Sequence, residues 1–264
     1  MPLPPHRRWD CGGPRRVVAL HCSLAHAGEW SGLAGGLQGV TLIAPDLPGH
    51  GAQPPWDGRS DDHAEAVRQA VALIGAEGGP VDLIGHSWGG TIALRLALER
   101  PELLRSLVLV EPVLFAAARA AGDPGFPAFV ATHKAVHDLA QAGRLAEAAA
   151  LFHQNWGGGE RFEDLPTRTQ AYMTDRMALV LAQNPVLLGD AAGLLRAWGL
   201  ESLGLPVLLV EGDQSPPVVA AIQAELVRRL PMARREVVAG AGHMLPVTHA
   251  ADLAALVMGH LPPL

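Results

Sequence analysis

The sequence predicts an α/β fold: a mostly parallel sheet of about six to eight strands, flanked by helices and carrying an inserted helical cap. Continuous apolar runs at 17–21, 40–44 and 81–84 are typical of strands buried on both faces. Segments with helical periodicity separate these runs, which implies right-handed crossovers and parallel pairing. Over 112–204 the strand pattern stops and helical patterns follow one another, which predicts the insertion.

Composition bounds the class of protein. The 264 residues are 49% hydrophobic and 17% charged, enough to bury one large core with an insertion. A net charge of -6 offers no basic surface for nucleic acid or an anionic membrane. We therefore expect a small-molecule substrate, neither of those partners, and a monomer or small homo-oligomer.

Cysteine usage and the N-terminal segment indicate the compartment. Cys11 and Cys22 are too few for a disulfide framework and lack metal-ligand spacing. No apolar stretch of signal-peptide type follows the basic N-terminus, and no run is long enough to span a bilayer. We expect a reducing, cytoplasmic setting.

The first half of the chain is predicted as follows. Residues 1–14, rich in Pro and Gly, form a loop or one poor hairpin. The next elements are a strand at 17–21, a short helix within 30–37, a strand at 40–44, a turn at 46–51, and a helix that begins near Ser60-Asp61-Asp62 and packs through Ala64, Val67, Val71 and Ile74.

The second half continues this alternation around the insertion. The strand at 81–84 is followed by a helix at 91–98 and a strand at 107–111. Helices at 129–142, 145–156 and 167–182 fill the insertion, and the sheet resumes with a strand at 206–211, a helix from Pro217, a strand at 235–238 and a final helix capped by Thr248. The predicted division is a core of 1–111 and 205–264 with a cap of 112–204.

One stretch carries the clearest chemical signal, Gly85-His-Ser-Trp-Gly89. An apolar strand breaks there and restarts as a helix, so Ser87 stands at the apex of a sharp turn. Gly85 and Gly89 suit the turn because a side chain at either place would crowd the backbone. The first N–H groups of the helix point toward any negative charge that develops at Ser87.

A serine hydroxyl needs a base, and the base needs a carboxylate that fixes its tautomer. Among twelve histidines, His243 stands in a Gly-rich turn after the last strand, where a loop can carry it over the strand ends. His86 is interpreted as a packing or supporting group. His133 and His137, four apart on a helix without a third ligand, are expected to be solvated, so we predict no metal site.

The remaining site residues follow from position. The N–H groups of Trp88 and of Ser23, with Leu24 as the alternative to Ser23, are the candidate donors to an oxyanion. All five Phe and the only Tyr lie in the insertion, which favours a cap over an apolar pocket, although the rings could equally form the insertion's own core. The candidate substrate-binding residues are His21, Leu24, Phe115 and Trp156.

These motifs together resemble the α/β-hydrolase superfamily. The resemblance rests on the elbow at 85–90, the His-Cys-Ser loop at 21–23, and the motifs at 46–51 and 240–243. It implies a sheet of up to eight strands, a helical cap after the sixth, and a hydrolytic Ser, acid, His triad. Sixteen residues precede the first certain strand, which predicts that one or both usual N-terminal strands are missing.

The acid departs from the family pattern. The family usually places an Asp three residues after the Gly that ends its seventh strand, and counting from Gly212 that position holds Ser215. Glu111 is the favoured alternative, because it ends a neighbouring strand and some haloalkane dehalogenases resemble this chain in carrying a catalytic Glu there. Asp213 is the second alternative, and its other role would be to cap the turn that follows.

The leading hypothesis is a serine hydrolase that cleaves a small or medium ester-like substrate with an apolar part, through an acyl-enzyme on Ser87. No organic cofactor or metal is needed. A Ser at the elbow argues against halide displacement and epoxide opening, which need a carboxylate nucleophile. The same residues would also serve a lyase, a C–C hydrolase or an acyltransferase, and a non-catalytic ligand-binding protein is the alternative from another class.

Overall fold

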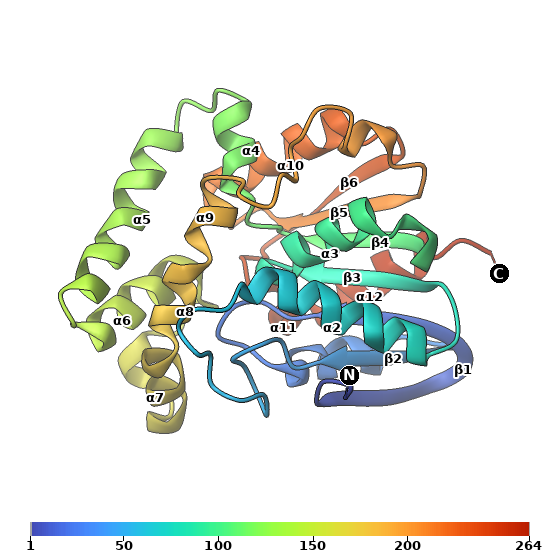
Figure 1. Ribbon diagram of the computed structural model, residues 1–264, viewed down its shortest axis with the longest axis horizontal. Coiled ribbons are helices and arrows are strands. Elements are labelled where there is room, and N and C mark those ends of the chain that lie inside the picture. Colours follow the sequence, from blue (N-terminus) through green and yellow to red (C-terminus); the bar gives the residue numbers. More distant parts are fainter. Residues whose placement is uncertain (1, 264) are drawn as a thin grey trace.

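The computed structural model describes residues 2–263 and has at its centre a six-stranded sheet in the order β2-β1-β3-β4-β5-β6 (Figure 1). Pairing from β1 to β6 through the centre of the sheet is parallel. The α/β class and the mostly parallel sheet are therefore confirmed. The strands are β1 His6–Leu20, β2 Val40–Pro45, β3 Val81–His86, β4 Leu104–Val110, β5 Val207–Gly212 and β6 Ala233–Val238.

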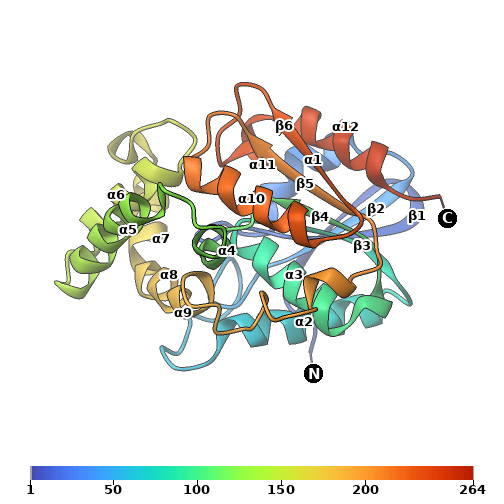
Figure 2. The same cartoon turned by 90° about the horizontal axis from the view of Figure 1, so that it is seen from above.

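Helices cover both faces of the sheet (Figure 2). One face packs against α1 Ser31–Gly36, α11 Leu245–Thr248 and α12 Ala250–His260. The other packs against α2 Asp62–Ala76, α3 Trp88–Glu99 and α10 Pro217–Arg229. Within β1, Val18 and Leu20 enter the second of these cores while Val17 and Ala19 enter the first. Burial of both faces explains why the strands read as continuous apolar runs.

The N-terminal residues differ from the prediction. Residues 6–14 are not a loop but the first part of β1, and they pair antiparallel with β2 from His6 opposite Pro45 to Cys11 opposite Val40. After a bend at 12–14, the pairing with β2 advances in the same direction along both strands, from Arg15 opposite Val40 to Val18 opposite Ile43. Because the same β2 residues pair twice, the two halves of β1 lie on its two edges. The first half of β1 is therefore an N-terminal strand segment beyond those that the sequence predicts.

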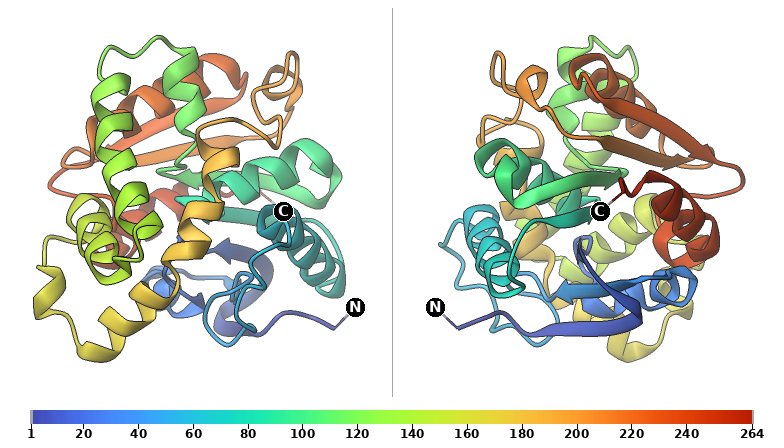
Figure 3. Two further views of the ribbon diagram at one scale, coloured as in Figure 1. Left: turned by 60° about the vertical axis from the view of Figure 1, so that its left-hand side comes forward. Right: turned by 90° about the vertical axis from the view of Figure 1, so that its right-hand side faces the viewer.

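Between β4 and β5 the chain forms the helices α4 Phe115–Ala120, α5 Phe126–Gln141, α6 Leu145–Trp156, α7 Thr167–Asp175, α8 Met177–Ala182 and α9 Asn184–Leu187. Helices α5 to α8 stand across one end of the sheet (Figure 3). They enclose a small core of their own, with Val136, Phe162 and Met177 among its residues. The two ends of the insertion do not join this small core, because Phe115 and Leu200 pack into the core of the sheet.

Two helix boundaries also differ from the prediction. The helix expected at 167–182 is broken at Arg176 into α7 and α8. Thr248 ends α11 and does not cap the final helix, whose N-cap position is His249. Over residues 2–263, no helix combines the length and the apolar character that a membrane crossing requires.

Candidate active site

Ser87 lies in the turn between β3 and α3, with φ 55° and ψ -116°, a strained conformation for a residue other than glycine. The two neighbouring glycines make this turn possible. A Cβ on Gly85 would come within 2.4 Å of the Gly89 carbonyl oxygen, and one on Gly89 within 2.3 Å of the Leu20 carbonyl oxygen. The turn therefore presses the start of α3 against the end of β1.

His243 reaches Ser87 from the loop after β6. Its Nε2 lies 3.0 Å from the Ser87 hydroxyl oxygen, and its Nδ1 lies 2.6 Å from Oε2 of Glu111. All three residues are buried. A carboxylate bonded to Nδ1 holds the proton there and leaves Nε2 free to accept the serine proton. Burial, together with the neighbouring His86, lowers the pKa of His243 despite the Glu111 carboxylate, so the ring is neutral and ready to act as a base.

Glu111 follows the last residue of β4 and has a φ of 45°. Its Oε1 accepts hydrogen bonds from the Gly212 backbone N–H, at 2.8 Å, and from the Ser215 hydroxyl. Burial disfavours the ionised carboxyl, but the bonds to His243, Ser215 and Gly212 outweigh burial and lower the pKa of Glu111. Ser215, at the position where the family usually has its Asp, thus donates to a carboxylate supplied by the neighbouring strand.

Asp213, the alternative acid, is not brought to the imidazole. Its side chain is exposed and accepts a hydrogen bond from the Gly240 backbone N–H at 2.8 Å, which fixes the loop that leads to His243. The structure corrects this alternative, because the residue that follows Gly212 points along the loop rather than across the strand ends.

The candidate oxyanion donors lie on two segments that meet at the elbow. The N–H of Trp88 is the first of α3 and has no partner within the helix. Ser23 follows β1, and its hydroxyl donates to Oε1 of Gln183 at 2.6 Å, which ties this loop to the helical insertion. Leu24 next to it has a φ of 64°, so the loop turns sharply there.

A cavity of about 360 Å³ reaches His243 and the loop that carries Ser23 and Leu24. Its other walls include the apolar side chains of Phe152, Trp156, Leu165, Met173 and Val247. The Trp156 ring stands edge-on to the His243 ring at a centroid distance of 4.7 Å. A second cavity of about 380 Å³, lined by Phe129, Val136 and Val218 among others, also has Trp156 in its wall.

Two expected substrate-binding residues lie elsewhere. His21 is fully buried; its Nδ1 donates to the Cys22 carbonyl, and its Nε2 accepts the Leu47 N–H at 2.9 Å. Phe115 is buried against Phe129 and Trp156 and lines neither cavity. Both are structural residues, because their positions at element ends face the protein core.

The other histidines are partly as expected. His133 is not solvated as predicted: its Nε2 donates to Oδ1 of Asn184 at 2.7 Å, and burial lowers its pKa. His86 is buried and supports the site from behind, with a ring centroid 5.0 Å from that of His243.

Sequence reasoning missed two polar residues. Glu29 binds His86 and the Cys22 backbone N–H, and Gln183 binds Ser23 across 160 positions of the chain. Glu29 precedes Trp30 in a short helical turn, and nothing in the local sequence distinguishes it from an exposed acidic residue. No sequence pattern marks Gln183, because its contact with Ser23 depends on how the helical insertion packs against the loop after β1.

Comparison with known proteins adds independent support. The family model described as the alpha/beta hydrolase fold matches residues 15–250. Lipase LipV of Mycobacterium tuberculosis is 38% identical over 41% of this chain and 41% of its own length, so this chain spans less than half of that relative. Esterase Rv0045c of the same organism is 29% identical over 96% of this chain and 85% of its own.

A solved structure shares the fold. The haloalkane dehalogenase DbeA-M1 loop variant from Bradyrhizobium elkanii superposes with a TM-score of 0.72 at 22% identity, covering 96% of this chain and 91% of that one.

Proposed function

Because the chain belongs to the alpha/beta hydrolase fold family, we propose that it is a serine hydrolase that cleaves esters with a small or medium apolar acyl part. The observation that carries the proposal is the continuous hydrogen-bond chain Ser87–His243–Glu111, with distances of 3.0 and 2.6 Å, at the edge of an apolar cavity. The esterase and lipase relatives support an ester as the substrate.

The proposed steps are consistent with this geometry. Ser87 Oγ attacks the carbonyl carbon while Nε2 of His243 takes its proton, and Glu111 stabilises the imidazolium that forms. The Trp88 and Ser23 N–H groups hold the negative oxygen. His243 then protonates the leaving alcohol. Water attacks the acyl-enzyme while His243 takes one of its protons, and the ring returns that proton to Ser87 Oγ as the carboxylic acid leaves. Every proton transfer passes through one ring, and no step calls on a metal.

The cavity walls support an apolar acyl group as part of the proposed substrate. Around His243 they are mostly apolar, with Leu24, Phe152 and Met173 facing the space. A volume of about 360 Å³ lies within the size range of small-molecule sites. We therefore assign the cavity to the acyl part of the ester. Cys11 and Cys22 are unpaired, which supports a reducing compartment, and we propose a cytoplasmic location.

A panel of p-nitrophenyl esters with acyl chains from two to twelve carbons tests the function. We expect turnover with a maximum at short to medium length, and a loss of roughly 10⁴-fold or more in kcat for Ser87→Ala. Ser60→Ala, in an exposed loop, is the matched control and keeps full activity. If Ser87→Ala retained wild-type turnover, or if no ester were cleaved by folded protein, the proposal would be wrong.

A further inference from the structure

A second His–carboxylate pair lies behind the first. Nδ1 of His86 is 2.6 Å from Oε1 of Glu29, and the two side chains are only 0% and 1% exposed. The other ring nitrogen, Nε2, lies 2.9 Å from the backbone carbonyl oxygen of His243. Neither side chain is hydrogen-bonded to the Ser87 hydroxyl, whose partner is His243, so the mechanism above does not use them.

The partners of His86 determine its protons. A backbone carbonyl has no hydrogen, so Nε2 must donate to the His243 oxygen. At Nδ1 the partner is a carboxylate oxygen, whose other oxygen already accepts the Cys22 N–H at 3.0 Å. A proton therefore lies between His86 and Glu29, and two good acceptors around one ring favour the imidazolium paired with an ionised Glu29. Although burial opposes both charges, the partners raise the pKa of His86 and lower the pKa of Glu29.

The pair connects three segments that catalysis must hold in register. His86 directly precedes Ser87 at the elbow. Its ring donates to the backbone carbonyl oxygen of His243 and so holds the loop after β6 that carries this residue, here called the His243 loop. Glu29 accepts the Cys22 N–H, one residue before Ser23, and so holds the loop after β1 that carries Ser23, here called the oxyanion loop. A small displacement of any one of these segments would separate the reacting groups.

We propose that Glu29 and His86 form a buried ion pair that positions the His243 loop and the oxyanion loop around Ser87 and balances the charge beside the catalytic imidazole. This inference rests on the proposed serine hydrolase function. Glu29 and His86 are positioning residues, because each acts through a backbone group and touches no reacting atom.

The charge balance has a measurable consequence. The His86 cation disfavours a second positive charge on His243, while Glu29 and Glu111 favour it. His21 and Cys22 also face the pair, but burial lowers the pKa of His21 and raises that of the Cys22 thiol, so both are neutral. Removing only the His86 cation therefore leaves the Glu29 carboxylate uncompensated, and this negative charge raises the pKa of His243.

The experiment compares His86→Gln with the double variant Glu29→Gln/His86→Gln. The Gln amide can still donate to the His243 carbonyl, so the single variant mainly removes charge. We expect the acidic limb of kcat/KM to move up by on the order of one pH unit in His86→Gln. The limb should return to its wild-type position in the double variant, where both charges are gone. A role in packing alone would leave the limb of both variants unmoved, and that result overturns the proposal.

Positioning is tested by His86→Asn, whose amide can reach Glu29 but not the His243 carbonyl. We expect kcat to fall roughly 100-fold with little change in KM. His260→Gln, on the last turn of α12, is the matched control and keeps wild-type kcat. A kcat for His86→Asn equal to that of wild type contradicts the positioning role.

The charge state is read without turnover by ¹⁵N NMR of histidine-labelled wild-type protein, with His86 assigned through its backbone neighbours. We expect both His86 ring nitrogens to be protonated at pH 7.5. A neutral ring overturns the proposal even if every variant unfolds. Because this measurement needs no substrate, a protein inactive toward esters would refute the proposed function separately.

Discussion

Ser87 and Glu111 both have a left-handed φ, at 55° and 45°, and both carry side chains of the candidate triad. Such conformations cost on the order of 1–3 kcal/mol for residues other than glycine, so the surrounding structure must enforce them. For Ser87 the enforcement comes from the glycines that let α3 approach β1. Glu111 is held by Gly212 and Ser215 of the neighbouring strand and its loop, which aim its other oxygen at His243.

At this scale the acid can be identified by mutation. Glu111→Gln leaves a neutral amide that cannot stabilise the imidazolium, so we expect kcat to fall by roughly 10³–10⁴. Asp213→Asn is the matched control and should change kcat less than about threefold, because Asp213 accepts only the Gly240 N–H and the Gln214 amide, and an Asn side-chain oxygen can accept the same bonds. Both variants are measured on the most reactive nitrophenyl ester. Equal losses, or a larger loss for Asp213→Asn, would reverse the assignment.

Among the elements, α6 brings the helical insertion against His243. It ends at Trp156, whose ring contacts His243 and lies in the walls of two cavities. Trp156 is the one residue shared by the two linings, so we expect its indole to stand between the two cavities. We therefore expect the end of this helix to limit the length of chain that the cavity beside His243 accepts.

Trp156→Ala should join the two cavities and shift the substrate preference toward longer chains. We expect the ratio of kcat/KM for dodecanoyl over butanoyl nitrophenyl esters to rise by roughly tenfold. Phe129→Ala enlarges the second cavity without removing the Trp156 indole, and it should leave this ratio near the wild-type value. An unchanged chain-length ranking in Trp156→Ala would show that the second cavity does not receive substrate.

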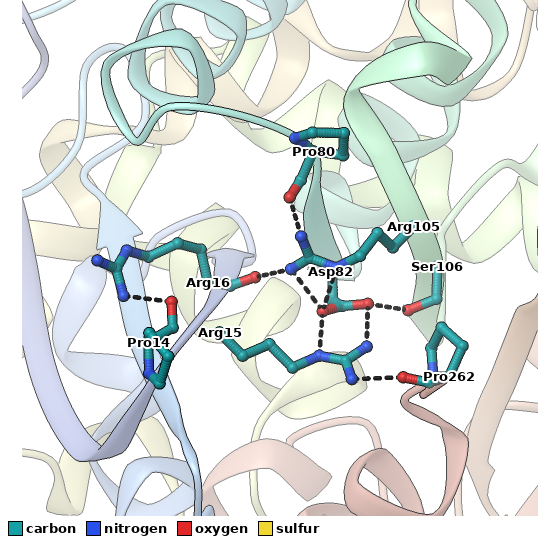
Figure 4. A network of polar contacts seen from close by, with 8 residues as sticks. All are labelled: Pro14, Arg15, Arg16, Pro80, Asp82, Arg105, Ser106 and Pro262. Atoms are coloured by element: carbon teal, nitrogen blue, oxygen red, sulfur yellow. Dashed lines mark hydrogen bonds and ion pairs between the residues drawn. The ribbon is translucent and has the colours of Figure 1, made fainter. Parts of the chain in front are cut away.

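At the scale of the whole molecule, the candidate catalytic residues and a buried ion-pair network that stabilises the fold lie at opposite ends of the strands. Asp82, near the start of β3, is 1% exposed and binds Arg15, Arg105 and Ser106, as Figure 4 shows. Arg15 also donates to the Pro262 carbonyl, so this network joins β1, β3 and β4 to the end of the chain. Burial opposes ionisation of Asp82, but the Arg15, Ser106 and Arg105 bonds outweigh it and lower its pKa.

Asp82→Asn should cost roughly 3 kcal/mol of unfolding free energy, because two arginines lose their shared carboxylate. The folded-state pKa of Asp82 lies below its unfolded value near 3.8. Its contribution is therefore complete above that value and lost as the pH falls through the folded-state pKa.

Urea unfolding of wild type and variant from pH 7 down to pH 3 measures both effects. The difference between them should shrink toward the acid end. Asp138→Asn, which breaks the exposed pair with Lys134, is the control and should change little at any pH. A penalty for Asp82→Asn that stayed constant down to pH 3 would contradict the electrostatic origin.

The sequence by itself determined the α/β class, the place of Ser87 at the elbow and the arrival of His243 on a late loop. Those inferences depend on local periodicity and glycine spacing, which are properties of neighbouring residues. It failed where a partner comes from a distant segment. Residues 6–12 became a strand because β2 had a free edge, His21 turned into the core, and Gln183 found Ser23.

Only the tertiary structure determines which of the two carboxylates, that of Glu111 or that of Asp213, lies beside His243. The sequence favours Glu111 but leaves Asp213 open. What separates them in space is that β4 lies beside β5, so Glu111 faces Gly212, Ser215 and His243 across the strand ends. The pair of Glu29 and His86 was settled in the same way, because a hydrogen bond between residues 57 positions apart depends on how strands and loops pack.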